Sequence, residues 1–163
     1  MRRRGLETVV TARNLGEKDA PYGVCPPHPY LVAGVDRLDE WSLEVSAGTV
    51  VTVTEDRLLP TGTAPIIPPG SEFDFSSARV IGDLFIDHAF TDLARDEDGR
   101  LRVTVTSTQG TGAELTSGPE CPWLQIHTGD QPDPAIDRLG GLAVEPMTCP
   151  PDAFRSGTDV VRL

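Results

Sequence analysis

The feature that most constrains the fold of this chain is a series of short stretches in which apolar and polar residues alternate. Residues 41–46 and 101–106 place an apolar side chain at every second position, and within residues 49–55 Val51 and Val53 alternate with threonines. A period of two is typical of half-buried strands. Proline- and glycine-rich segments also occur, such as residues 21–29, where four prolines and a glycine exclude a helix. No stretch predicts a helix longer than about one turn, so the sequence predicts an all-β protein, an antiparallel β-sandwich.

Local patterns predict how some of these strands connect. The β-branched residues within Leu6–Asn14 predict a strand, and residues 41–46 and 49–55 predict a hairpin that turns at Ala47 and Gly48. Residues 59–70, rich in proline and glycine, predict a long loop. Asp98-Gly99 is a turn signal and predicts the tip of a second hairpin with residues 101–106 as one arm.

Length and charge narrow the class of protein. With 163 residues and no composition break, the chain predicts a single domain over residues 1–163. It has 14 basic and 25 acidic residues, a net charge of -11, which argues against nucleic acid and anionic membranes as partners. No apolar run is long enough for a transmembrane helix, and the start predicts no secretory signal. Three cysteines without a paired pattern predict reduced thiols in a cytoplasmic protein.

Two stretches carry candidate catalytic residues. Glu145 follows the apolar run Leu142–Val144 and precedes Pro146, so we expect a brief buried strand, broken by proline, whose carboxylate faces a cleft. The simpler interpretation is a surface glutamate at a strand end. His28 lies between prolines that restrict its backbone, which suits a residue that must be held in place, although a plain loop histidine has the same pattern.

The sequence lacks the motifs of several common kinds of catalytic and binding site. Cys25 and His28 have the spacing of a zinc ligand pair, but no second close pair exists, and no metal site is predicted. The chain has no nucleophile elbow, no P-loop and no dinucleotide fingerprint. Asp87 and His88 are adjacent in an extended segment, so their side chains point to opposite faces and we expect one toward the core and one toward a cleft.

Four motifs in order resemble the aldose 1-epimerase (galactose mutarotase) family: NLGEKDAPYGVCPPHPYL, FIDHAFTDL, PWLQIHTGD and GLAVEPMTCPPDAF. The resemblance runs from about Leu6 to the end and implies a galactose mutarotase-like β-sandwich, of which this chain is similar only to the C-terminal part. The first half of that domain, with further strands and sugar-binding residues that include a histidine and an arginine, has no counterpart assigned here.

The resemblance also implies roles for particular residues. His28 matches the general acid toward the ring oxygen, and Glu145 matches the base that takes the proton from the anomeric hydroxyl. Asp87 matches an aspartate that hydrogen-bonds sugar hydroxyls, and Trp123 and Gln125 lie in the strand that lines the sugar cleft. Acid and base suffice for mutarotation, so we expect no cofactor and a monosaccharide, a hexose or related sugar, as the substrate.

Two alternatives stay open at this stage. One is a non-catalytic carbohydrate-binding module that has kept the cleft and lost turnover. The other is a half-domain that requires a complementary N-terminal chain or associates with itself as a homo-oligomer, because a sandwich without half of its strands exposes edges and apolar faces.

Overall fold

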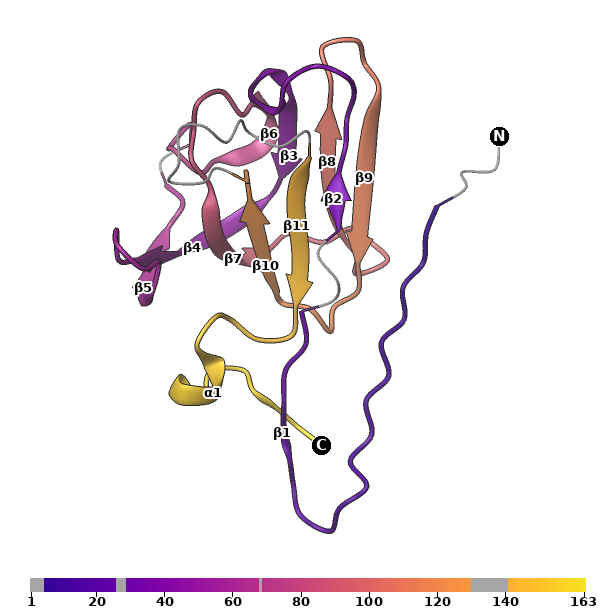
Figure 1. Ribbon diagram of the computed structural model, residues 1–163, viewed down its shortest axis with the longest axis vertical. Helices are drawn as coiled ribbons and strands as arrows, with labels where there is room; N and C mark the ends of the chain where they lie inside the picture. Colours follow the sequence, from indigo (N-terminus) through magenta and orange to yellow (C-terminus); the bar gives the residue numbers. More distant parts are fainter. Residues whose placement is uncertain (1–4, 26–28, 68, 130–140) are drawn as a thin grey trace.

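Two antiparallel sheets pack against each other in the computed structural model, which describes residues 5–25, 29–67, 69–129 and 141–163 (Figure 1). The six-stranded sheet has the order β2 (Tyr30–Leu31), β11 (Leu142–Met147), β10 (Trp123–His127), β7 (Asp87–Leu93), β4 (Ala47–Val53) and β5 (Pro60–Pro65). The four-stranded sheet has the order β6 (Phe75–Val80), β3 (Ser42–Val45), β8 (Leu101–Thr106) and β9 (Gly112–Ser117). The chain is therefore the antiparallel all-β protein that its sequence predicts.

Three small elements complete the described structure. β1 (Pro21–Tyr22) pairs with β12 (Val161–Arg162) beside the two sheets, so the end of the chain returns to the segment that precedes β2. A 3₁₀ turn spans Leu38–Glu40, and a single helical turn, α1, spans Ala153–Ser156. No helix among these residues has both the length and the apolar character needed to cross a bilayer.

The core lies between the two sheets. The four-stranded sheet contributes Leu43 and Val103, the six-stranded sheet contributes Phe90 and Leu124, and all four side chains are almost completely buried. Trp41, just before β3, joins the same cluster. The alternation in the sequence predicted the inward positions of Leu43 and Val103, because every second side chain of a strand points to one face.

The predicted hairpin at Ala47 and Gly48 is wrong. β3 and β4 are separated by Ser46 alone, yet β3 pairs with β6 and β8 while β4 pairs with β5 and β7. The chain passes from one sheet to the other at this point. Gly48 lies inside β4, where a Cβ atom would come within 3.0 Å of the Cβ of Asp92 on β7. The glycine therefore permits close approach of two strands, a role that looks the same in a sequence as a turn.

The predicted loop over residues 59–70 is also wrong in part, because it contains β5. This strand is at the edge of the six-stranded sheet, and its prolines, Pro60 and Pro65, are its terminal residues. Proline is tolerated in such a strand because an edge leaves one side of the backbone without ladder hydrogen bonds.

The strand predicted at Leu6–Asn14 is absent from the described structure. Residues 5–15 are extended but pair with no described strand, and Leu6 and Val9 are largely exposed. Figure 1 shows this segment running apart from the sandwich. The side chain of Asn14 anchors its end by donating to the carbonyl of Leu163 at 2.7 Å. β-propensity indicates a strand only where a neighbouring strand is available for pairing.

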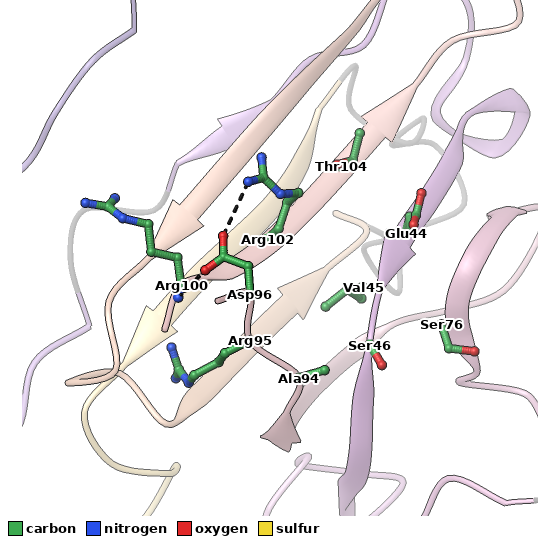
Figure 2. Close-up of a pocket in the computed structure, with 10 residues that line it drawn as sticks. All are labelled: Glu44, Val45, Ser46, Ser76, Ala94, Arg95, Asp96, Arg100, Arg102 and Thr104. Atoms are coloured by element: carbon green, nitrogen blue, oxygen red, sulfur yellow. Dashed lines mark hydrogen bonds and ion pairs between the residues drawn. The ribbon is translucent and has the colours of Figure 1, made fainter. Parts of the chain in front are cut away.

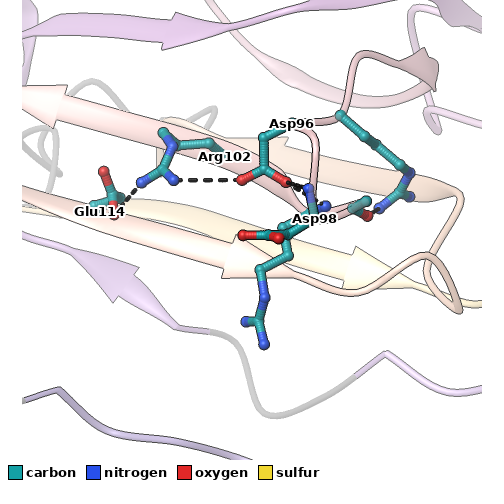
Figure 3. A network of polar contacts seen from close by, with 7 residues as sticks. Asp96, Asp98, Arg102 and Glu114 are labelled. Atoms are coloured by element: carbon teal, nitrogen blue, oxygen red, sulfur yellow. Dashed lines mark hydrogen bonds and ion pairs between the residues drawn. The ribbon is translucent and has the colours of Figure 1, made fainter.

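The turn predicted at Asp98-Gly99 exists, but it does not close a hairpin. The carboxylate of Asp96 accepts the backbone N–H groups of Asp98 and Arg100, and Gly99 takes a positive φ of 73°. Arg102 extends this network by contacting Asp96 and Glu114 (Figure 3). The flanking strands β7 and β8 belong to different sheets, so the turn joins the two layers.

Candidate functional site

A cavity on the outward face of the six-stranded sheet brings together three of the predicted site residues. Its volume is about 270 Å³. Asp87, Gln125 and Glu145 supply polar groups to its wall, and Val51, Ala89 and Met147 supply apolar surface. An apolar wall with a few convergent polar groups is the usual character of a small-molecule site.

Strand register explains why these side chains meet. Gln125 of β10 lies directly opposite Glu145 of β11 and, on its other side, opposite Ala89 of β7. The next row on the same face pairs His127 with Asp87. Leu124 and Ile126, at the alternate positions of β10, are fully buried in the core. One face of this strand therefore serves packing and the other serves the cavity.

Asp87 organises the polar groups of the cavity. Its Oδ1 accepts a 2.6 Å hydrogen bond from Nε2 of Gln125, and its Oδ2 lies 3.7 Å from Nδ1 of His127. Within the described structure, Oε1 of Gln125 and Nδ1 of His127 are buried and have no hydrogen-bond partner. Buried polar atoms are usually paired in folded proteins. The amide oxygen of Gln125 is thus a buried acceptor for which the described residues supply no donor.

Glu145 is a buried carboxylate in the middle of a strand. Only 8% of the residue is exposed, and Sγ of Cys25 donates a hydrogen bond to its Oε2 over 3.3 Å. The strand continues through Pro146 to Met147, so proline does not end it as the sequence suggested. Glu145 is one of the residues that line the cavity.

Trp123 lies on the cavity face of β10 but packs beside the cavity. It forms a small apolar cluster with Val51, Ala89 and Met147, and it is 6% exposed. Its Nε1 donates to Oδ2 of Asp159 over 2.8 Å. The indole ring therefore supports one wall and connects it to the C-terminal segment.

Asp87 and His88 point to opposite faces, as their adjacency predicted. Asp87 lines the cavity, whereas the ring of His88 lies 4.7 Å from that of Phe73, measured between centroids. Burial lowers the pKa of His88, which favours the neutral imidazole. His28, the predicted acid, lies outside the described residues.

Sequence reasoning assigned no role to two residues that the structure places near this site. Cys25 was considered only as a metal ligand, and its contact with Glu145 spans 120 positions that no local pattern connects. His127 alternates with Gln125 in LQIHT, and this signal could have placed it on the same face. Three clustered His, Cys, Asp or Glu side chains that could hold a metal do not occur within the described residues.

A second cavity, of about 190 Å³, lies over β3, β6 and β8 and the turn after β7 (Figure 2). Arg95, Arg100 and Arg102 border it, but Asp96 and Glu44 do so as well. Arg95 donates to the carbonyls of Gly99, Gly118 and Cys121, so its charge serves to hold two loops together. Arg95 and Arg102 are therefore engaged in structural contacts, the latter with Asp96 and Glu114.

Fold and site together define an antiparallel β-sandwich protein with a carboxylate-bearing cavity on one sheet. The family model described as aldose 1-epimerase matches residues 2–163. The chain belongs to the aldose 1-epimerase family.

One curated relative and two solved structures are similar to this chain. YihR of Escherichia coli K12, an uncharacterized protein, is 32% identical over 159 residues, which are 98% of this chain and 47% of YihR. A crystal structure of a putative aldose 1-epimerase from the same organism matches with a TM-score of 0.66 at 20% identity, over 92% of this chain and 48% of that one. A Caenorhabditis elegans GalM/aldose epimerase homologue matches with a TM-score of 0.53 at 20% identity, over 70% of this chain and 38% of that one.

These structural matches show a shared fold. The chain spans about half the length of YihR and of the putative epimerase that it matches.

Proposed function

We propose that this protein is an aldose 1-epimerase-like isomerase that interconverts the α and β anomers of a free hexose or a closely related sugar. The observation that supports this function best is the placement of Glu145. A buried carboxylate lies in the wall of a cavity beside an aspartate and a glutamine that present hydrogen-bonding groups to the same space. Family membership supports a sugar epimerase-like activity, and the position of Glu145 in the cavity wall supports its role as the base.

In the proposed reaction, Glu145 takes the proton from the anomeric hydroxyl, O1. The C1–O5 bond breaks, and an acid delivers a proton to O5, so that the sugar opens to the aldehyde. Rotation about C1–C2 and closure on the other carbonyl face give the other anomer, with the two proton transfers reversed. We assign the acid to His28 on the family resemblance, because imidazole donates and regains a proton near neutral pH.

Asp87 and Gln125 would bind sugar hydroxyls. A carboxylate accepts hydrogen bonds from hydroxyl groups, and a side-chain amide both donates and accepts. The pair is already connected at 2.6 Å, so both groups are oriented before a ligand arrives. Each proton transfer is worth about 10²–10⁴-fold in rate, and the reaction changes no oxidation state. Our proposal includes a cytoplasmic location, where a free sugar is available and the three free cysteines stay reduced.

Polarimetry tests this function directly. Fresh α-D-glucose and α-D-galactose are mixed with the protein, and the first-order approach to the equilibrium rotation is compared with the rate in buffer alone. We expect an added rate proportional to protein concentration, and we expect Glu145→Gln to abolish it while sugar binding, measured by calorimetry, persists. Glutamine keeps the shape of the side chain but cannot accept the proton. Full turnover by the variant would remove Glu145 from the role of base.

The second candidate is a non-catalytic sugar-binding module or a half-domain that requires a partner chain. The polar groups of the cavity suit it, because Asp87 and Gln125 can bind sugar hydroxyls whether or not a proton is transferred. The same two assays separate the candidates. Saturable sugar binding without any rate above buffer supports the module, and a rate that appears only on addition of an N-terminal chain supports the half-domain.

A further inference from the structure

Cys25 contacts the proposed base from a distant part of the sequence. Its Sγ lies 3.3 Å from Oε2 of Glu145, within hydrogen-bonding distance for sulfur, and the carboxylate is an acceptor only. The final torsion of a glutamate side chain is broad and poorly restricted by its own covalent structure. A donor fixed on one carboxylate oxygen therefore restricts how the carboxylate plane can turn toward the cavity.

The backbone holds Cys25 in place for this contact. The neighbouring Val24 exchanges two hydrogen bonds with Thr148, its N–H donating to Oγ1 over 2.9 Å and its carbonyl accepting from the N–H over 3.0 Å. Close packing at Gly23 adds to this, since a Cβ atom there would lie 2.6 Å from Sγ of Cys149. The segment before Cys25 is thus fastened to the residues that follow β11, the strand that carries Glu145.

The thiol is suited to donate a hydrogen bond and poorly suited to act as a nucleophile. Cys25 is an exposed residue whose sulfur is partly buried against Glu145. This partial burial, then the hydrogen bond to Glu145, then the charge of that carboxylate raise the pKa of Cys25 to about 12. A thiol with such a pKa keeps its proton over the whole neutral range, whereas reactivity requires the thiolate. The pKa of Cys121, which is also near Cys25, is raised as well. Burial is the largest cause, and Glu145 does not contribute to this shift.

We propose that Cys25 is a positioning residue whose thiol holds the carboxylate of Glu145 in the orientation that the cavity requires. This inference rests on the proposed epimerase function for its catalytic consequence, but the contact itself can be tested without turnover.

The first test is kinetic and uses four proteins: the parent chain, Cys25→Ala, Cys25→Ser and the control Cys121→Ala. We expect Cys25→Ala to lower kcat roughly tenfold with KM within about twofold of the parent, because one hydrogen bond to a charged group is lost. We expect Cys25→Ser, which keeps a donor, to recover most of the rate. Cys121→Ala should retain the parent rate.

The second test measures thiol reactivity by mass spectrometry after iodoacetamide treatment at pH 8. Glu145→Gln removes the negative charge that opposes thiolate formation at Cys25. Each unit by which a thiol pKa falls raises its thiolate fraction about tenfold below that pKa, so we expect alkylation of Cys25 to be at least about tenfold faster in the variant. Cys121 in the same sample is the internal control and should react at an unchanged rate.

The two tests separate failure of this inference from failure of the proposed function. An active parent whose Cys25→Ala variant has an unchanged kcat overturns the positioning role, as does equal loss in the alanine and serine variants together with a lowered melting temperature. If the parent has no turnover, the epimerase function fails, and the alkylation test alone decides. Faster reaction of Cys25 in Glu145→Gln then supports the positioning contact, and an unchanged rate overturns it.

Discussion

Truncating two adjacent residues of β10 should affect different properties, because one faces the core and the other faces the cavity. Loss of the core residue should lower stability, and loss of the cavity residue should lower sugar affinity. Leu124 is completely buried and lies in the interior of the six-stranded sheet, between β11 and β7. Paired strands on both sides hinder collapse around a smaller side chain. We therefore expect Leu124→Ala to lower the free energy of unfolding by about 3 kcal/mol, within the range of about 2–5 kcal/mol for such changes.

The matched variant is Gln125→Ala. It loses one hydrogen bond to Asp87 and removes one buried acceptor, Oε1, that has no partner within the described residues. These two effects oppose each other, so we expect the free energy of unfolding to change by less than about 1 kcal/mol. Sugar affinity, in contrast, should fall about tenfold or more, since one hydrogen bond to a ligand hydroxyl is worth about that factor.

Urea titration and thermal melting measure the stability difference, and calorimetry with glucose or galactose measures affinity. For a chain of this length, about 3 kcal/mol corresponds to a fall in Tm of about 6–12 °C for Leu124→Ala. Equal losses of stability in the two variants would refute the assignment of opposite faces. A Gln125→Ala variant with parental sugar affinity would refute the placement of the sugar in this cavity.

Three further outcomes are expected. Arg95→Met should lower the free energy of unfolding by about 2–4 kcal/mol, because three backbone carbonyls lose a charged donor. In the same urea titration, the exposed control Arg100→Ala should change this free energy by less than about 0.5 kcal/mol. Asp74, whose pKa is lowered to about 2 chiefly by the hydroxyl of Ser76, contributes stability above pH 3.8 that is lost as the pH falls toward 2. Asp74→Asn should therefore lower Tm at pH 6 and leave it unchanged near pH 2, and an equal Tm difference at both values contradicts this. Residues 5–14 form an extended segment that pairs with no strand of the described structure, so light scattering should show a mass that rises with concentration. A monodisperse monomer contradicts self-association.

The fold class was predictable from local sequence, and the strand connections were not. Alternation around Leu43 and Val103 marked inward positions correctly because side-chain direction in a strand follows from backbone geometry alone. Whether two consecutive strands pair with each other depends on where the rest of the chain lies. Gly48 and Asp98-Gly99 therefore looked like hairpin turns. Gly48 instead lies inside β4, close to β7, and Asp98-Gly99 lies in a turn that joins the two sheets.

The candidate site shows the same division. The sequence by itself determined that Asp87 and His88 face opposite ways and that a carboxylate at residue 145 accompanies a short apolar strand. Only the tertiary structure decided that Gln125 lies opposite Glu145, that His127 lies opposite Asp87, and that Cys25 donates to the carboxylate of Glu145. These contacts join residues far apart in the chain, and their register is set by the packing of two sheets around one core, which no local pattern encodes.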